Sequence, residues 1–331
     1  MTPGPRNLIT DVPGLSVGQA TDERAGTGVT VLLCPDAAAA AADVRGGGPG
    51  VRETATLEPE NFVGTCHAVA LTGGSVFGLA AADGVVAALS ERGIGLRLRP
   101  GSKALPIVPA AVLHDLHNPG DKDWGLEPPY RRLGMESVAS AGADFTLGAH
   151  GAGRGAMAGL IKGGIGSASL DLGGGIVAGA LIASNPVGSV VMADGETFWA
   201  WPFEIGGEFG GKRPSPDAAP AIDPFPDHGR LRAAGVLAPG ANTTIGAVAT
   251  SARLTTAECK RLAMMAQDGL ARAIRPAHTP FDGDTLFAIS TGAAELSPDE
   301  PRAMQIARIG AALADCVARA IARGVFAARA G

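Results

Sequence analysis

Aromatic residues are scarce in this sequence, and charged ones are few. Of its 331 residues only 4% are aromatic and 18% are charged, whereas 46% are hydrophobic and 49 are glycine. A core with so few large rings has to be filled by small and branched side chains, and the abundant glycine lets neighbouring backbones pack closely. The composition therefore predicts a globular protein of thin, tightly apposed layers, as one large α/β domain or two smaller ones.

An excess of positive charge and a long apolar run are also missing. The formal net charge is −5 and no stripe of lysine and arginine occurs, which argues against a nucleic-acid partner. No window reaches the ~18 consecutive apolar residues of a membrane span, and residues 1–7 contain no apolar signal-peptide region. We therefore expect a cytoplasmic enzyme that acts on a small molecule or a peptide and binds no membrane.

The cysteines form no metal-binding or disulfide pattern. They are widely spaced along the chain, at Cys34, Cys66, Cys259 and Cys316. In a cytoplasmic protein, cysteines at such spacing are expected to be reduced and buried.

Thr243 is the candidate nucleophile. A polar run rich in proline and glycine, residues 206–239, precedes it, and small apolar residues typical of a buried strand follow Thr244. A threonine hydroxyl needs a base in order to attack an amide, and a free α-amine on the same residue, with a pKa of about 7.7–8.0, can serve as that base. From the residues alone, β-branched residues that fill a sheet are the commoner interpretation of a Thr-Thr pair.

The α-amine of Thr243 becomes free only if the bond between Asn242 and Thr243 is cut. A strained turn at Pro239 and Gly240 could press the Thr243 hydroxyl against the Asn242 carbonyl. An N-to-O acyl shift would then form an ester, which water hydrolyses. This route divides the chain into residues 1–242 and 243–331.

Two segments carry a resemblance to a known family. Residues 240–250 (Gly-Ala-Asn-Thr-Thr-Ile-Gly and onward) and residues 278–288 (His-Thr-Pro-Phe-Asp-Gly-Asp-Thr-Leu-Phe-Ala) resemble the self-processing L-aminopeptidase/D-amidase-esterase family, which includes β-peptidyl aminopeptidases and nylon-oligomer hydrolases. The combination of a threonine nucleophile with Asp-Gly-Asp is most similar to the nylon-oligomer-hydrolase-like branch. The resemblance extends from Ile9 to about Ser290, and residues 206–239 match least.

Membership of this family implies an α/β fold: a four-layer α/β/β/α sandwich of the N-terminal-nucleophile type. It also implies a single domain over residues 1–331, cut into the two chains given above, and a homotetramer of such pairs. Alternating strands and small-residue helices are compatible with this fold, but they do not distinguish it from a doubly wound sheet.

The resemblance also assigns catalytic roles. Thr243 would be the nucleophile, the Asn185 amide would donate to the oxyanion, and Lys162 would lower the pKa of the Thr243 amine, while Asp282 and Asp284 would set charge and position. Each residue also has an ordinary interpretation: a solvated lysine, an Asn-Pro turn, and an Asx turn at Asp-Gly-Asp.

Gly73, Gly74 and His114 are candidates for substrate binding. The two glycines lie in a turn between an expected strand, residues 66–71, and an expected helix, residues 76–92. Their N–H groups could receive an anion, although the same turn is also plain α/β connectivity. His114 ends an expected strand, residues 108–115, where family members carry an aromatic residue that faces the substrate. With His117 it could ligate zinc, but no third ligand follows at helical spacing, so we predict no metal.

Two glycine-rich segments have no assigned chemistry. Residues 43–53 are expected to form a loop whose backbone can lie close to a substrate. Residues 148–169 suggest a dinucleotide site, but no clear strand precedes Gly151 and no acidic residue follows at the required distance. This segment instead resembles the family's stretch that ends in Lys-Gly-Gly-Ile-Gly, and we predict no cofactor.

Near the C-terminus two helices are predicted. Thr255 and Glu258 form a capping box that begins a helix reaching about Arg275, and residues 303–328 have the 3.6-residue apolar spacing of an amphipathic helix. The second helix would cover a sheet face or pack against another subunit.

The expected reaction is acyl transfer from an amide to Thr243 and then to water. Short peptides, D-amino acid amides, β-peptides and ω-amino-acid oligomers require the same catalytic groups, so these substrates remain open. One alternative is a threonine acyltransferase of the glutamate/ornithine acetyltransferase type, whose Ala-Thr-Met-Leu type cleavage site is missing here. Another is an uncut, non-catalytic ligand-binding protein.

Overall fold

A computed structural model describes residues 1–218 and 242–330. The strained turn expected at Pro239 and Gly240, and most of the polar run over residues 206–239, lie outside the described residues. No helix within the described ranges is long and apolar enough to cross a membrane.

One large mixed sheet forms the centre of the molecule, in the order β3-β5-β4-β2-β11-β10-β9-β8, with β1 also paired to β2. Its strands are β1 (Ser16–Asp22), β2 (Thr27–Val44), β3 (Val51–Arg52), β4 (Thr65–Thr72), β5 (Ala110–Val112), β8 (Gly164–Gly173), β9 (Ile176–Asn185), β10 (Thr243–Ala252) and β11 (Thr285–Ala294). A separate hairpin consists of β6 (Met157–Ala158) and β7 (Ile161–Lys162). The helices are α1 (Ala80–Glu91), α2 (Tyr130–Ala139), α4 (Thr256–Ala266), α5 (Asp268–Ala273) and α6 (Arg302–Ala330). Short 3-10 helices span Ile9–Asp11, Thr54–Leu57, Ser75–Leu79, Gly151–Gly153 and Trp201–Phe203.

The long strand β2 divides the sheet into two layers. Its first half pairs with β1 and β4, the β4 pairing continues over Ala38 and Ala39 after an irregularity between Leu33 and Ala38, and its second half pairs with β11. A strand that carries an irregularity bends at that point, so β2 can pass from one layer to the other. The layer around β1, β4 and β5 and the layer around β8 to β11 therefore share β2.

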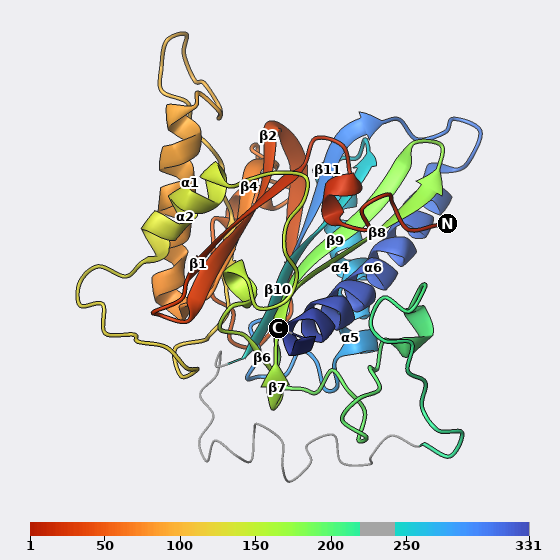
Figure 1. Cartoon of the computed structure of the whole chain (residues 1–331). Coiled ribbons are helices and arrows are strands. Elements are labelled where there is room, and N and C mark those ends of the chain that lie inside the picture. Colours follow the sequence, from red (N-terminus) through yellow and green to blue (C-terminus); the bar gives the residue numbers. More distant parts are fainter. Residues whose placement is uncertain (219–241, 331) are drawn as a thin grey trace.

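Three hydrophobic clusters fill the spaces between layers. One lies between the two sheet layers and includes Leu32, Leu71, Ile245 and Phe287. A second joins α1 and α2 to β2 and β4, and a third joins α4, α5 and α6 to the outer face of β8 to β11. Because alternate residues of a strand face opposite sides of the sheet, each central strand contributes side chains to two of these clusters. Figure 1 shows the resulting order of helices, sheet layer, sheet layer and helices, so the predicted α/β sandwich is confirmed.

The C-terminal helices follow the sequence pattern. The side chain of Thr255 accepts a hydrogen bond from the Glu258 N–H, and the reciprocal capping contact is present, so the capping box begins α4 as predicted. The expected helix is interrupted at Gln267, which separates α4 from α5. The prediction for the cysteines is confirmed, because all of them are buried and free.

The topology places the ends of three strands together. β10 and β9 are antiparallel, and Thr243 pairs with Asn185. β10 and β11 are parallel, and Ile245 pairs with Thr285, so the residues that precede β11 lie beside those that begin β10. The segment with Asp282 and Asp284 is thereby brought to Thr243.

Candidate active site

Thr243 lies against the bond that the sequence analysis predicted to be cut. It begins β10 with only 2% of its surface exposed, and Asn242 is fully buried. The Thr243 Oγ1 donates a hydrogen bond to the carbonyl oxygen of Asn242. The hydroxyl is therefore in contact with the carbonyl group that it would have to attack.

The backbone of residues 281–283 holds this peptide unit from one side. The Gly283 N–H donates to the Asn242 carbonyl oxygen at 3.0 Å, and the Asn242 N–H donates to the Phe281 carbonyl oxygen at 3.3 Å. A Cβ atom on Gly283 would lie 2.9 Å from the Thr243 Oγ1 and 2.8 Å from the Gly48 carbonyl oxygen. Only glycine fits here without displacing the nucleophile, a constraint that the Asp-Gly-Asp motif alone does not reveal.

Asp282 is a fully buried carboxylate. Its Oδ1 accepts from the Val187 N–H at 3.1 Å, and its Oδ2 accepts from the Thr279 N–H at 3.0 Å and the Thr279 hydroxyl at 2.6 Å. Burial, followed by the negative charge of Asp284, raises the pKa of Asp282 to about 6. This carboxyl group therefore changes its charge close to neutral pH.

Asp284 connects the residue after the nucleophile to a histidine. Its Oδ1 accepts from the Thr244 N–H at 2.7 Å, and its Oδ2 lies 3.0 Å from the His278 backbone nitrogen and 2.8 Å from the His278 Nδ1. His278 holds a left-handed backbone conformation, with φ of 57°, which is uncommon for a residue with a side chain. His278 belongs to the same sequence motif as Asp284, but no role could be predicted for it, because a histidine six residues before an aspartate is not a recognisable pattern.

The glycine-rich segment over residues 43–53 packs on the Asp-Gly-Asp loop. The N–H groups of Arg45 and Gly46 donate to the Asp284 carbonyl oxygen at 2.9 and 3.2 Å, and the Gly48 N–H donates to the Asp282 carbonyl oxygen at 2.9 Å. A Cβ atom on Gly46 would lie 2.3 Å from the Asp284 nitrogen. The close backbone approach expected of this segment is thus made to the loop that carries both carboxylates.

Asn185 ties three segments together next to Thr243. Its side-chain Oδ1 accepts from the Met157 N–H at 2.9 Å, and its Nδ2 donates to the His114 carbonyl oxygen at 3.1 Å. The His114 ring in turn contacts the ring of His117, with 3.2 Å between the Nε2 and Nδ1 atoms. The structure therefore brings Asn185 and His114 to the nucleophile, and the oxyanion role of Asn185 stays a prediction.

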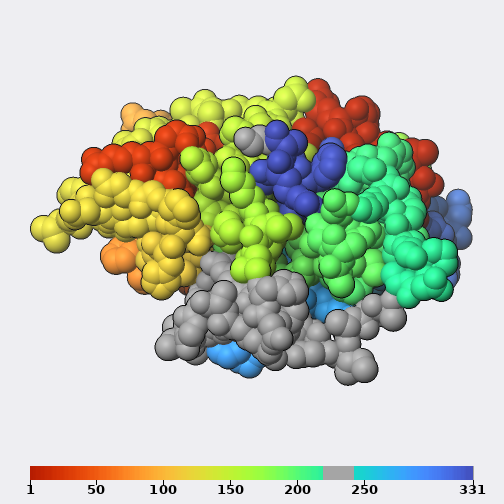
Figure 2. All heavy atoms as spheres, turned by 60° about the horizontal axis from the view of Figure 1, so that its bottom comes forward, coloured from red at the N-terminus to blue at the C-terminus, as the bar shows by residue number. Residues whose placement is uncertain are grey.

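Lys162 belongs to the same neighbourhood through its backbone. It pairs with Met157 in the β6–β7 hairpin, and Met157 is the residue whose N–H binds Asn185. The lysine itself is exposed, on a hairpin that lies at the surface of the face turned forward in Figure 2. Its predicted effect on the Thr243 amine remains a prediction.

The backbone N–H groups of Gly73 and Gly74 were expected to be available to an anion, but in the structure each of them already has an acceptor. The Gly73 N–H donates to the Gly28 carbonyl oxygen at 3.0 Å, and the Gly74 N–H donates to the Asp115 Oδ1 at 2.7 Å. The other oxygen of this buried carboxylate accepts from the Thr27 hydroxyl at 2.6 Å. Both N–H groups therefore have acceptors inside the protein and hold the turn in place, and the part of Gly73 and Gly74 in substrate binding stays a prediction.

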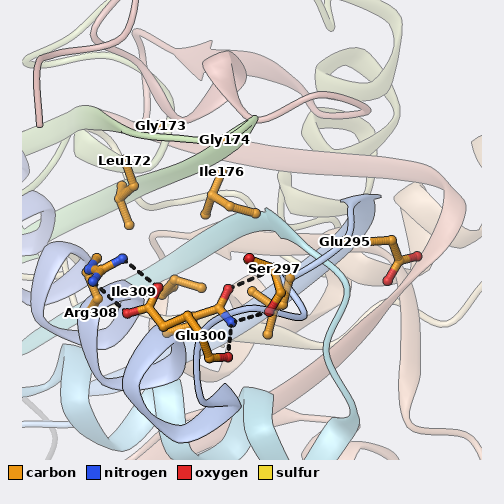
Figure 3. A pocket seen from close by; sticks show the side chains of 11 residues that line it. Leu172, Gly173, Gly174, Ile176, Glu295, Ser297, Glu300, Arg308 and Ile309 are labelled. Atoms are coloured by element: carbon orange, nitrogen blue, oxygen red, sulfur yellow. Dashed lines mark hydrogen bonds and ion pairs between the residues drawn. The ribbon is translucent and has the colours of Figure 1, made fainter.

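Within residues 1–218 and 242–330, no three histidine, cysteine or acidic side chains are arranged to hold a metal ion. A separate pocket of about 360 Å³ lies away from Thr243, where the β8–β9 turn meets the start of α6. Figure 3 shows that Glu300 and Arg308, which line this pocket, form an ion pair.

Comparison with known proteins places nearly the whole chain in one family. The model of peptidase family S58 matches residues 7–330. An uncharacterised aminopeptidase of Mycobacterium tuberculosis is 42% identical over 335 residues, which cover 97% of this chain and 94% of the relative. The 6-aminohexanoate-oligomer endohydrolase of Paenarthrobacter ureafaciens is 32% identical over 304 residues, which cover 88% of this chain and 77% of the relative.

Solved structures agree on the fold. A β-aminopeptidase of Burkholderia sp. matches with a TM-score of 0.68 and 24% identity, over 98% of this chain and 87% of the other. The L-aminopeptidase D-Ala-esterase/amidase of Ochrobactrum anthropi, described as a new variant among the Ntn hydrolase fold, matches with a TM-score of 0.69 and 20% identity, over 99% and 88%. The arrangement of helices and sheet layers is therefore similar to the fold that is described for the Ochrobactrum protein as a variant of the Ntn hydrolase fold.

Proposed function

The chain belongs to peptidase family S58 and is a peptidase or amidohydrolase, and we propose that it cuts itself before Thr243 and then uses Thr243 as an N-terminal nucleophile. The observation that carries this proposal is the contact of the Thr243 Oγ1 with the Asn242 carbonyl oxygen, which also accepts the Gly283 N–H at 3.0 Å. The attacking Thr243 hydroxyl, the Asn242 carbonyl group and the Gly283 N–H that would stabilise the developing negative charge therefore lie in contact with one another.

In the self-cleavage step the Thr243 Oγ forms a bond to the Asn242 carbonyl carbon. Negative charge develops on the carbonyl oxygen, where the Gly283 N–H stabilises it. The C–N bond then breaks, and the proton lost by the hydroxyl ends on the Thr243 nitrogen. Water hydrolyses the resulting ester, leaving a carboxylate on Asn242 and a free amine on Thr243.

In turnover the same hydroxyl attacks the carbonyl of a substrate amide. The new α-amine takes the hydroxyl proton and returns it to the leaving amine, and water releases the acyl group. Asp282 and Asp284 set the charge and hold the loop around the nucleophile, while Asn185 and Lys162 support the oxyanion and the neutral amine. We also propose short peptide or amide substrates, a homotetramer of paired fragments and a cytoplasmic location.

Intact-mass measurement and a denaturing gel test the proposal. Purified wild-type protein should consist of fragments 1–242 and 243–331, and Thr243→Ser should give the same fragments. Thr243→Ala should leave one unbroken chain and lower amide hydrolysis by at least about 10⁴-fold, because the nucleophile is missing.

Thr244→Val is the matched control for this substitution. Thr244 is the next residue, is equally buried, and its Oγ1 has no hydrogen-bond partner among the described residues. Valine has nearly the same shape, so this variant should still be cut and active. A Thr243→Ala protein that is cut at the same bond, or that hydrolyses amides at the wild-type rate, would rule out the mechanism.

A further inference from the structure

Residues 278 and 279 bind the two carboxylates of the Asp-Gly-Asp loop in the same way. The backbone nitrogen of His278 lies 3.0 Å from the Oδ2 of Asp284, and its ring Nδ1 lies 2.8 Å from the same oxygen. Thr279 donates its backbone N–H, at 3.0 Å, and its hydroxyl, at 2.6 Å, to the Oδ2 of Asp282. Each of the two consecutive residues therefore directs one main-chain and one side-chain group at a single carboxylate oxygen.

His278 makes its two contacts from an unfavourable backbone conformation. Its φ of 57° lies in the left-handed region, which residues with side chains seldom occupy, although asparagine, aspartate and histidine do so more often than the others. Residues in such conformations persist where the surrounding contacts fix them, and they are concentrated at functional sites. Here the two contacts with Asp284 offset the cost, since both the N–H and the ring of His278 reach the same oxygen.

Asp284 passes this contact on to the strand that begins with the nucleophile. An ionised carboxylate only accepts hydrogen bonds, so the His278 Nδ1 carries the proton that lies between them. The other oxygen, Oδ1, accepts from the Thr244 N–H at 2.7 Å, and this N–H belongs to the peptide unit that follows Thr243. Among the described residues, no lysine or arginine forms an ion pair with Asp284. His278 is thus the basic side chain that fixes this buried carboxylate.

Building on the proposed function, we infer that His278 is a positioning residue of the active site. Through Asp284 it fixes the peptide unit after Thr243, and with it the direction of the Thr243 hydroxyl and of the amine that self-cleavage releases. His278 acts on the reacting atoms only through Asp284. The role requires a hydrogen-bond donor at the Nδ1 position and a left-handed backbone, and it requires no positive charge.

Three substitutions of His278 separate the donor from the backbone. Glycine adopts the left-handed conformation readily but has no ring, whereas asparagine tolerates it and carries a neutral N–H donor close to the place of Nδ1. In His278→Gly we expect kcat and the rate of self-cleavage to fall by about 10–10²-fold, because the reacting groups are displaced. In His278→Asn both rates should stay within about threefold of wild type, and KM should change by less than about threefold in either variant.

His278→Asp has the shape of the asparagine variant without its donor. It should lose at least as much activity as His278→Gly, and it decides the question if the glycine variant does not fold. Ala37 also has a left-handed backbone, with φ of 55°, and lies in the irregular part of β2. Ala37→Gly is therefore the control for placing glycine at such a position, and both of its rates should equal the wild-type values.

A double-mutant cycle tests whether His278 acts through Asp284. Once Asp284→Asn has removed the carboxylate, His278→Gly should slow self-cleavage by less than about threefold further. An equal loss in both backgrounds, wild-type rates in His278→Gly, or an asparagine variant as slow as the aspartate one would overturn the inference. In each of these cases a wild-type protein that is cut before Thr243 and active leaves the proposed function standing. Wild-type protein that stays uncut and inactive would instead refute the proposed function itself.

Discussion

Glu208 and Asp282 are both carboxylates withdrawn from solvent, but only Glu208 has arginine partners. The side chain of Glu208 is 9% exposed and lies 2.6 Å from Arg319 and 3.4 Å from Arg323. Asn7 also donates to it, at 2.7 Å. Asp282 is fully buried and is bound by the backbone N–H groups of Val187 and Thr279 and the Thr279 hydroxyl. No arginine or lysine in the described ranges forms an ion pair with it.

The pKa values of the two carboxyl groups are consequently shifted in opposite directions. Burial alone would raise the pKa of each, but the hydrogen bond and charge of Arg319 hold the pKa of Glu208 below its usual value. Asp282 has no such cation, and burial together with Asp284 raises its pKa to about 6. The paired carboxylate joins the N-terminal segment and the loop after β9 to α6, whereas the unpaired one lies beside the bond between Asn242 and Thr243 that we propose is cut. A buried carboxylate without an arginine or lysine partner therefore distinguishes the proposed reactive end of this molecule from the structural pair at α6.

Gly283→Ala should have the largest effect, and it acts only at the reactive end. The added Cβ would meet the Thr243 Oγ1 at 2.9 Å and the Gly48 carbonyl oxygen at 2.8 Å, so the nucleophile and the N–H donor cannot both keep their positions. Loss of one oxyanion donor costs about 10²–10³ in rate, and we expect at least that loss in self-cleavage and in kcat. Gly142→Ala is the control, because its Cβ would meet nothing closer than 3.8 Å; equal activity of the two variants would contradict this geometry.

Arg319→Leu tests Glu208, the carboxylate that has arginine partners. Arg319 is 1% exposed and its removal leaves Glu208 without its main partner. Removing one member of a buried pair costs about 3–5 kcal/mol, which urea unfolding of the cut protein would measure, while kcat at 25 °C should stay near the wild-type value. The exposed pair of Arg24 and Asp121, with side chains 75% and 44% exposed, provides the control: Arg24→Leu should leave the free energy of unfolding close to the wild-type value, because water screens this pair. A large loss of kcat in Arg319→Leu would show that the two carboxylates are coupled.

The pH dependence of kcat/KM should report the unpaired carboxylate. Asp282 loses its proton as pH rises through about 6, and its proposed role of setting the charge around Thr243 requires the ionised form. We therefore expect kcat/KM to fall about tenfold per pH unit below this value, with a second dependence from the Thr243 amine below the about 7.7–8.0 of an ordinary α-amine, because Lys162 is proposed to lower its pKa. In Asp282→Asn the lower dependence should disappear from a slower enzyme, and its persistence would assign the titration to another group.

The sequence predicted the strands and helices better than it predicted the contacts within the site. Local patterns were sufficient for the α4 capping box and the amphipathic α6, because each depends on residues close together in the chain. The family resemblance, rather than periodicity, supplied Thr243, Asp282, Asp284 and the four-layer fold.

Contacts between distant segments could not be predicted. The glycine-rich residues 43–53 meet the Asp-Gly-Asp loop only because β2 and β11 are neighbours in the sheet. The Gly74 N–H is occupied by Asp115, and the His278 ring reaches Asp284, through tertiary packing that no local pattern records. The sequence of the turn at residues 73–74 shows its N–H donors but not the acceptors that bind them.

Arg308→Ala should have the smallest effect. Arg308 lies outside the surroundings of both Glu208 and Asp282, so its substitution serves as a reference for the comparison of these two carboxylates. Arg308 pairs with Glu300 at 2.7 Å in the pocket of Figure 3, and the two side chains are 49% and 30% exposed, so water already screens the pair and its loss should cost less than about 1 kcal/mol. Ile176 lines this pocket and Asn185 lies at the nucleophile, at opposite ends of β9, roughly 30 Å apart at the usual rise per residue. Self-cleavage and kcat/KM should therefore equal the wild-type values, and a change of more than about threefold would mean that the pocket communicates with Thr243 along the strand.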